Sequence, residues 1–330
     1  MKTGTPINDA SVWRAEDLGG RESWTRNLTP AMIDEVRAAI PRVGKTPPHQ
    51  IRAADHPLPG LAGLLALVHD DLENGRGFAV LAGWPVDDFS HDDTMAAYYM
   101  MAAQVGDIVV QNYEGQSVVD VIDEEIPYSH LSRGYRSNKR LLFHSDGAGL
   151  TALLCLDVAA RGGVSQLVSA TTLFNTIRAE RPDDLPLLER GFYHHRRRQH
   201  DPGEHPLSAK PIPVFAFHGG YLHCCYNRNP IDWVEKEGME LPAEEVAVLD
   251  HVDALVARTE LQAVMEMQKG DMQFVNNFTI LHSRTEYHDD ADHRRHLVRL
   301  WMEDPRSKRL GESLLDLYVP GTSRFQAAHS

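Results

Sequence analysis

The sequence predicts an α+β fold that is mainly β, with a barrel or sandwich of short strands and helices packed around it. Two observations predict this fold. The first hundred or so residues carry mostly helical patterns, whereas from about residue 107 short apolar runs alternate with Gly, Pro, Asp and Asn turns at regular spacing. The chain has no internal repeat and no clear linker. We therefore expect one domain over 1–330, in which a helical part over 1–106 packs on a β core over 107–330 that carries helical insertions.

Three helices and one strand are expected in the N-terminal part, the helices at 28–40, 61–75 and 90–106 and the strand at 77–84. Thr29 and Ser90 precede two of the helical patterns as N-caps, because their hydroxyls can accept a hydrogen bond from a free backbone N–H of the first turn. Pro30 follows Thr29 in the first turn, where its missing N–H is tolerated. Gly75 is expected to end the second helix.

The β core is expected to contain several short strands and two helices. Its strand segments are rich in β-branched and aromatic residues and are bounded by turn residues. These segments are 107–113, 117–122, 139–144, 150–156, 165–170, 213–226, 272–282 and 295–302, and the two helices are 171–182 and 242–261.

The composition limits the class of protein and its partners. Apolar residues make up 42% of the chain, which is enough for a sizeable core. Lys and Arg total 33 against 47 Asp and Glu, for a net charge of −14, which disfavours nucleic acid and anionic membranes as partners. The start of the chain has no signal-peptide pattern, and the longest apolar run, 61–68, is too short to span a membrane. We expect a cytoplasmic protein that acts on a small molecule; the oligomeric state stays open, a homo-oligomer included.

The three cysteines indicate a reducing compartment, since three residues cannot form a disulfide framework. They are Cys155, Cys224 and Cys225. No C-x-x-C motif accompanies the adjacent pair, so we interpret them as small buried apolar residues and not as zinc ligands.

One His-x-Asp pair predicts part of a metal site. The pattern occurs five times, beginning at His69, His91, His144, His251 and His288. Three of these pairs lie on predicted helices, where residues two apart point about 200° from each other, and the last lies in a polar, loop-like stretch. His144 and Asp146 instead end a predicted strand, where residues two apart share a face. Either they are two polar groups satisfied at a strand end, or they are half of a metal site.

A third ligand is predicted at His282, which ends the apolar run 272–282. Two His and one carboxylate form the facial triad that holds Fe(II) and leaves open positions for other ligands. A hydrogen-bonded core histidine is the alternative interpretation of His282. Farther on, Arg295 and Arg299 alternate onto one face of an otherwise apolar strand. Buried guanidinium groups need anions, either internal carboxylates or the carboxylate of a ligand.

Together these motifs resemble the taurine dioxygenase-like (TauD/TfdA) and clavaminate synthase-like family of iron(II)- and 2-oxoglutarate-dependent dioxygenases. The resemblance covers most of the chain and includes GFAVLAGW at 77–84, the GG-x-S segment at 162–165, GDMQFVNNFTILHSR at 270–284 and RRHLVRLW at 294–301. It implies a double-stranded β-helix, or jelly-roll, core. It also implies that Fe(II) is bound by His144, Asp146 and His282.

The resemblance also implies where 2-oxoglutarate and the substrate bind. Arg295 matches the arginine that pairs with the distal carboxylate of 2-oxoglutarate, and Arg294 is a minor rival for that role. Ser165 stands where a threonine usually binds the same carboxylate. Arg299 matches a second arginine near the cosubstrate or the substrate. Because the carboxylate ligand Asp146 is present, the resemblance favours hydroxylation, or a variant such as desaturation, over halogenation.

The substrate is less well specified by the sequence. Candidate contacts are polar residues in segments expected to line the opening of the barrel, namely Gln111, Asn112, Tyr113, Tyr226, Arg228, Asn276 and Asn277. The basic segment HHRRRQH at 194–200 could attract an anion, although a solvated strand edge is the simpler interpretation. We expect an amino acid or another small carboxylate. Alternatives are a zinc hydrolase with the same ligands, a binding protein without turnover, and a jumonji-type oxygenase, against which the two arginines argue.

Overall fold

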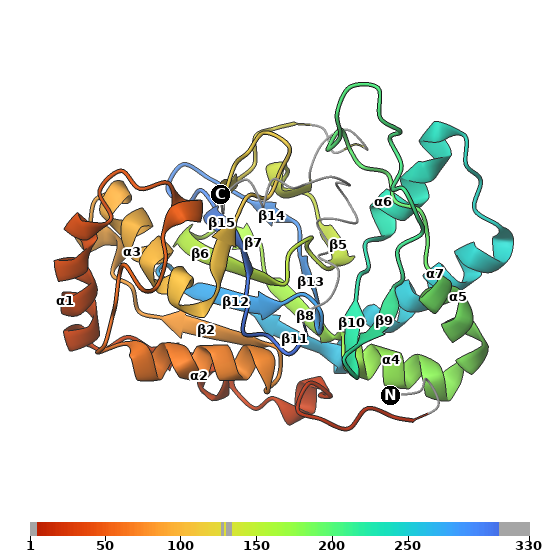
Figure 1. Ribbon diagram of the computed structural model, residues 1–330, viewed down its shortest axis with the longest axis horizontal. Helices are drawn as coiled ribbons and strands as arrows, with labels where there is room; N and C mark the ends of the chain where they lie inside the picture. The colour runs from red at the N-terminus through yellow and green to blue at the C-terminus, as the bar shows by residue number, and fades with distance from the viewer. Residues whose placement is uncertain (1–4, 127–128, 130–133, 310–330) are drawn as a thin grey trace.

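The protein, described here from a computed structural model, folds into a mixed α/β architecture with several antiparallel sheets. The structure describes residues 5–126, 129 and 134–309. The main sheet has seven strands in the order β1-β2-β12-β6-β15-β3, and β4 also pairs with β15 (Figure 1). Its strands are β1 (Thr25–Asn27), β2 (Phe78–Ala82), β3 (Asp107–Val109), β4 (Val118–Val121), β6 (Leu150–Asp157), β12 (Met272–Asn276) and β15 (His296–Glu303).

A second sheet of four strands carries part of the predicted metal site. Its order is β11-β8-β13-β5, with β11 at Gln262–Met265, β8 at Ser165–Ser169, β13 at Ile280–Arg284 and β5 at Leu141–His144. Two small antiparallel pairs complete the strands: β9 (Phe215–His218) with β10 (Tyr221–Cys224), and β7 (Arg161–Gly162) with β14 (Tyr287–His288). Among the described pairs of strands, only β1 and β2 run parallel.

The helices form two groups on opposite sides of the sheets (Figure 1). Next to the main sheet lie α1 (Pro30–Ala39), α2 (Ala62–Glu73) and α3 (His91–Val105), and around β9 and β10 lie α4 (Ala170–Glu180), α5 (Leu185–Arg190), α6 (Arg228–Asp232) and α7 (Ala243–Val256). Thr29 and Ser90 cap α1 and α3, as predicted, by accepting hydrogen bonds from Met32 N and Asp93 N. In the described residues, no helix is long and apolar enough to cross a membrane.

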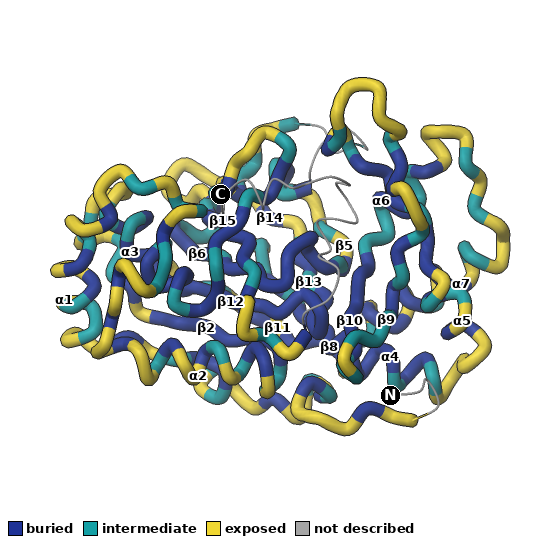
Figure 2. Tube along the Cα trace, viewed as in Figure 1, coloured by how far each residue is buried: buried dark blue, intermediate teal, exposed yellow. Residues whose placement is uncertain are grey.

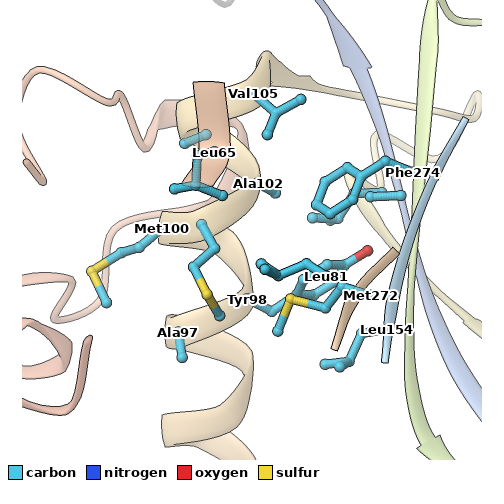
Figure 3. Packing of buried hydrophobic residues seen from close by; sticks show 14 of the residues in the cluster. Leu65, Leu81, Ala97, Tyr98, Met100, Ala102, Val105, Leu154, Met272 and Phe274 are labelled. Atoms are coloured by element: carbon cyan, nitrogen blue, oxygen red, sulfur yellow. The ribbon is translucent and has the colours of Figure 1, made fainter. Parts of the chain in front are cut away.

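A large apolar core lies between the main sheet and helices α2 and α3. Figure 3 shows Phe274 and Met272 of β12 and Leu81 of β2 facing Tyr98 and Ala102 of α3. The central strands β2, β6, β12 and β15 are buried along almost their whole length, while most exposed residues follow the outer helices and loops (Figure 2). Burying β2 on both faces explains its continuous apolar run.

A short crossing between the two sheets positions the site. The chain leaves the main sheet at the end of β12 and enters the second sheet at β13 within a few residues. Asn276 stabilises this crossing, because its side-chain oxygen accepts from Phe278 N at 3.0 Å and its side-chain nitrogen donates to Leu72 O at 3.1 Å. His282 of β13 is thereby brought opposite His144 of β5 in the antiparallel register.

Each predicted strand segment and helix contains an element of the expected type. The differences are local. The sequence did not indicate β1, β11, α5 or α6, which are short. His288 was expected in a loop but ends strand β14. Arg295 immediately precedes β15, and the register with β6 shifts between His296 and Leu297, so simple alternation along the strand does not set the direction of Arg295.

Phe274→Ala is expected to lower the free energy of unfolding by about 3–5 kcal/mol, because it removes a fully buried ring at the centre of the main sheet and leaves a cavity. Chemical denaturation of the variant and the wild type measures the difference. Exposed Leu67→Ala on α2 is the control and is expected to change little. A loss below about 1 kcal/mol for Phe274→Ala would contradict this assignment of the core.

Candidate active site

Three predicted ligands meet where the end of β5 lies beside the middle of β13. The ring centroids of His144 and His282 lie 4.4 Å apart, and Asp146 follows two residues after β5. His144 Nε2 lies 4.0 Å from Asp146 Oδ1, and His282 Nε2 lies 3.7 Å from Asp146 Oδ2. One donor atom from each residue falls within 4.8 Å of the others, which is close enough for one ion to bind all three.

The two imidazoles are held in the form that binds a metal. His144 Nδ1 donates to the carbonyl of Leu142 at 2.8 Å, so its Nε2 carries the free lone pair. Burial lowers the pKa of His144. Burial, followed by the neighbouring His144, lowers the pKa of His282 to about 3. Both rings are therefore neutral at physiological pH, as metal ligation requires.

Asp146 is a buried carboxylate that stays ionised. Burial by itself raises the pKa of Asp146, but the charge of Arg299, together with the hydrogen bond from Thr151, holds the pKa well below its usual range. Thr151 Oγ1 donates to Asp146 Oδ2 at 2.9 Å, and Arg299 Nη1 donates to Oδ1 at 3.3 Å. A buried anion between two neutral imidazoles is a site that a divalent cation would stabilise.

Further polar side chains hold Asp146, Thr151 and Arg299 in place through hydrogen bonds. Asn277 accepts from Asp146 N at 3.1 Å and donates to Thr151 Oγ1 at 3.0 Å. Gln111 accepts from Arg299 Nε at 2.8 Å and donates to the carbonyl of Arg299 at 3.0 Å. Asn277 and Gln111 were predicted as substrate contacts, and these hydrogen bonds make them supports of Asp146 and Arg299.

The donor set fits Fe(II). Two imidazole nitrogens and one carboxylate oxygen within 4.8 Å of one another are the donor set of the facial triad of non-haem iron oxygenases, and they would hold such an ion. The neutral rings, the ionised Asp146 and the hydrogen bond that orients His144 are the features by which such a site is prepared for its metal.

A second feature of the interior is a pair of buried arginines. Arg295 and Arg284 both lie over the ring of Tyr287, with their guanidinium carbons 5.1 and 4.7 Å from its centroid. Arg284 Nη2 donates to the carbonyls of Ser137 and Lys139, but its Nε and Nη1 and Arg295 Nη1 have no hydrogen-bond partner among the described residues. Burial, with Arg295 nearby, lowers the pKa of Arg284 to about 10. Two neighbouring buried guanidinium groups, with donors left unsatisfied among the described residues, favour the binding of an anion.

Ser165 and Gly163 lie beside this arginine pair. Ser165 is buried at the start of β8 and pairs with Arg284 in the register of β8 and β13. Gly163 has a φ of +71°, and a Cβ there would lie 2.9 Å from Arg295 Cδ and Nε. Only glycine therefore combines this backbone angle with this approach to Arg295. Arg294, the minor rival to Arg295, is exposed.

The remaining predicted substrate residues are dispersed. Tyr226 is fully buried, and its hydroxyl donates to Asp253 Oδ1 at 2.5 Å. Arg228 binds carboxylates on two helices, those of Asp232, Asp250 and Asp253. Asn112 binds Gln116, while Tyr113 binds Gln199 through its backbone N–H and Asp201 through its hydroxyl.

Sequence reasoning missed Thr151 and Arg284. Arg284 lies two residues after His282 on the same strand, so the period of two that placed His144 and Asp146 together could have placed it on the same face. Thr151 contacts Asp146 across the turn that joins β5 to β6, and no local pattern indicates that contact.

The comparisons with known proteins agree with this geometry. Residues 42–301 match the model of the taurine catabolism dioxygenase TauD, TfdA family, so the chain belongs to this family. FR-33289 synthase of Streptomyces rubellomurinus is 32% identical over 320 residues, covering 94% of each chain. The structure of an asparagine oxygenase with Fe(II), (2S,3S)-3-hydroxyasparagine and succinate is similar, with a TM-score of 0.65, 18% identity, and coverage of 90% of this chain and 98% of the other.

A further similar structure is that of the non-haem iron oxygenase OrfP with Fe and α-ketoglutaric acid, with a TM-score of 0.59, 15% identity, and coverage of 84% of this chain and 93% of the other. The protein is thus an iron(II)- and 2-oxoglutarate-dependent oxygenase with a His144–Asp146–His282 triad.

Gly163→Ala is expected to weaken 2-oxoglutarate binding by about tenfold or more, because the new methyl group displaces Arg295. The visible charge-transfer band of the Fe(II)–2-oxoglutarate chelate, followed during anaerobic titration, measures the dissociation constant. Gly238→Ala has a similar φ of +79° and meets nothing within 4 Å, so it shares the backbone strain but not the clash. Equal 2-oxoglutarate affinity in the two variants would contradict the prediction.

The metal-free protein is expected to lose stability as the pH falls below about 6.5, where unfolded histidines take up protons. Burial lowers the pKa of His194, like that of His282, to about 3 in the folded state. Between pH 6.5 and pH 3, each of these histidines takes up a proton in the unfolded state but not in the folded state. The free energy of unfolding therefore falls by up to about 1.4 kcal/mol per pH unit for each histidine as the pH is lowered. Chemical denaturation from pH 7.5 to pH 5 tests this slope, and His194→Gln should make it shallower. A stability that does not change over this range would be inconsistent with the two buried neutral rings.

Proposed function

We propose that this oxygenase hydroxylates an unactivated carbon of a small polar metabolite, an amino acid or a derivative, with release of succinate and CO2. The observation that carries the proposal is the presence of a complete triad together with a separate pair of buried arginines. The triad supplies three metal ligands. The arginine pair next to Ser165 supplies unsatisfied donors for the distal carboxylate of 2-oxoglutarate.

The proposal also describes the core as a double-stranded β-helix. The main sheet and the four-stranded sheet share the crossing from β12 to β13, and their strands are antiparallel except at β1. In that arrangement, His144 ends β5, Asp146 lies in the turn that follows it, and His282 lies in the middle of the neighbouring β13.

Each side chain has a role in this proposal. His144, Asp146 and His282 hold the iron, while Arg295 and Ser165 fix the far end of 2-oxoglutarate. Bound Fe(II) with 2-oxoglutarate and O2 supplies the oxidising chemistry, which converts the cosubstrate to succinate and CO2. Thr151 and Arg299 orient the Asp146 carboxylate and keep it ionised. Because Asp146 occupies the third protein ligand position, no halide can take it, and the proposal is hydroxylation.

An amino-acid-like substrate is supported by two features. The asparagine oxygenase structure that resembles this fold holds a hydroxylated amino acid. In this chain, Arg299 Nη2 is buried and has no hydrogen-bond partner among the described residues, although Nη1 of the same guanidinium contacts Asp146. Arg299 can therefore bind a further anionic oxygen of the cosubstrate or the substrate.

Succinate release is the test of the proposed activity. The protein with Fe(II), 2-oxoglutarate and O2 is expected to release succinate in step with a hydroxylated product when a panel of L-amino acids and their derivatives is supplied. Asp146→Ala is expected to reduce this release by more than about a hundredfold, since it removes the proposed carboxylate ligand of the iron.

Two outcomes would contradict the proposal. A product that has lost two hydrogens without gaining oxygen would show desaturation at the same site. Substrate turnover that needs Zn²⁺ and neither 2-oxoglutarate nor O2 would show a hydrolase. Glu303 offers a control, because its carboxylate accepts from Gly149 N at 3.1 Å in the turn between β5 and β6; Glu303→Gln should retain coupled turnover.

A further inference from the structure

Residues 134–139 form a strap that contacts two of the interior arginines. The strap begins with a single turn of 3-10 helix, Gly134–Arg136. Its first half contacts Arg299, which lies beside the metal ligands, and its second half contacts Arg284. The strap therefore joins the surroundings of the triad to the arginine pair that is proposed to bind 2-oxoglutarate.

The second half of the strap is held through its backbone. Arg284 Nη2 donates to the carbonyl of Ser137 at 2.7 Å and also to the carbonyl of Lys139. Between these two, the carbonyl of Asn138 accepts from Tyr287 N at 3.1 Å. Three successive carbonyls of the strap are thus bound by β13 and β14. The position of this half of the strap therefore depends on where the guanidinium of Arg284 lies.

The guanidinium of Arg284 also has donors left for the cosubstrate. Its Nε and Nη1 are buried and have no hydrogen-bond partner among the described residues. Arg284 and Arg295 lie over the same ring, that of Tyr287, so both can reach one anion. A guanidinium is planar and holds its five N–H groups in a fixed fork. A carboxylate that binds the free donors of Arg284 therefore also fixes the direction of Nη2 toward the strap.

The first half of the strap lies against the arginine that supports the metal ligand. The guanidinium carbon of Arg299 lies 4.9 Å from the ring centroid of Tyr135 in the strap and 4.9 Å from that of Trp301 in β15. Aromatic faces attract a guanidinium at this distance. Arg299 Nη1 donates to Asp146 Oδ1 at 3.3 Å. The position of Tyr135 thus influences how Arg299 holds the carboxylate of Asp146.

We propose that Arg284 is a positioning residue that links the distal carboxylate of 2-oxoglutarate to the metal ligand Asp146 through the strap. This inference rests on the proposed function, in which the arginine pair binds that carboxylate. The bound cosubstrate fixes Arg284, Arg284 fixes the carbonyls of the strap, and Tyr135 then holds Arg299 against Asp146. Because coupling between two sites is reciprocal, a change at Tyr135 also changes the affinity for 2-oxoglutarate.

A double-mutant cycle tests this link. Arg284→Lys keeps the positive charge, but an ammonium group has no planar fork and cannot hold the carboxylate and the strap in one fixed geometry. Tyr135→Leu removes the ring that lies over Arg299. Arg136→Gln is the matched control on the same strap, because Arg136 binds Glu124 instead. 2-Oxoglutarate is titrated without O2 into the Fe(II) form of each single and double variant, and the charge-transfer band gives the dissociation constant.

Tyr135→Leu is expected to raise the dissociation constant of 2-oxoglutarate about 3- to 10-fold in the otherwise unaltered protein. In the Arg284→Lys background, the same substitution is expected to change the constant by less than about twofold, since the link is already broken. Arg136→Gln is expected to change the constant by the same factor in both backgrounds.

Amide hydrogen exchange gives a second measurement that needs no variant. Addition of 2-oxoglutarate to the Fe(II) form of the wild type is expected to slow exchange in peptides that cover the strap by about threefold or more, because the strap opens less often once Arg284 is fixed. Peptides from α1, on the far side of the main sheet, are the internal reference and are expected to exchange at an unchanged rate.

Two results would overturn the role of Arg284 and leave the oxygenase assignment intact. One is an equal effect of Tyr135→Leu in the two backgrounds, and the other is a chelate band that forms without any slowing of exchange in the strap. Absence of the chelate band in the wild type is a different result, since the proposed function then fails first and the inference fails with it.

Discussion

The structure of the site depends on one buried negative charge, the carboxylate of Asp146. An ionised carboxylate away from water is costly unless it is paired and hydrogen-bonded. Arg299 and Thr151 supply that pairing here, and the neutral His144 and His282 complete a ring of ligands to which a divalent cation can bind. Asn277 and Gln111 act one step farther out, since they hold Thr151 and Arg299 in place. The local hydrogen-bond network can be understood as support for this carboxylate.

The charge of the whole chain and the charge of its interior have opposite signs. The protein carries a net charge of −14, yet its described interior includes the buried arginines Arg284, Arg295 and Arg299. The net charge of a protein influences its non-specific binding to large charged partners. It does not determine the electrostatic potential inside a binding site, because a few buried charged groups dominate the field there. An interior with unsatisfied guanidinium donors is suited to a dianionic cosubstrate. In the proposed function, binding of 2-oxoglutarate both completes the site and offsets the repulsion between Arg284 and Arg295.

The sequence predicted the parts of the site that follow from local periodicity. His144 and Asp146 share a strand face, and His282 ends an apolar run, so alternation was sufficient to suggest them. The resemblance to a known family then supplied the remaining assignments. Contacts between distant segments could not be predicted in this way. The acidic partners of Arg228 lie on α6 and α7, and the partner of Gln199 lies at Tyr113, so no local pattern reveals whether these polar side chains are available to a ligand. The register shift before Leu297 likewise breaks the alternation on which the direction of Arg295 was inferred.

The central claim is that His144, Asp146 and His282 hold Fe(II) in a form that 2-oxoglutarate can chelate. The most direct measurement is an anaerobic titration of the metal-free protein with Fe(II) and then with 2-oxoglutarate, observed through the visible charge-transfer band of the chelate. In the wild type, the band is expected to saturate at one Fe(II)–2-oxoglutarate chelate per protein chain. No band is expected in His144→Ala, and a band of unchanged intensity is expected in exposed His293→Ala. A wild-type protein that binds Fe(II) without developing the band, or a band that survives in His144→Ala, would contradict this claim.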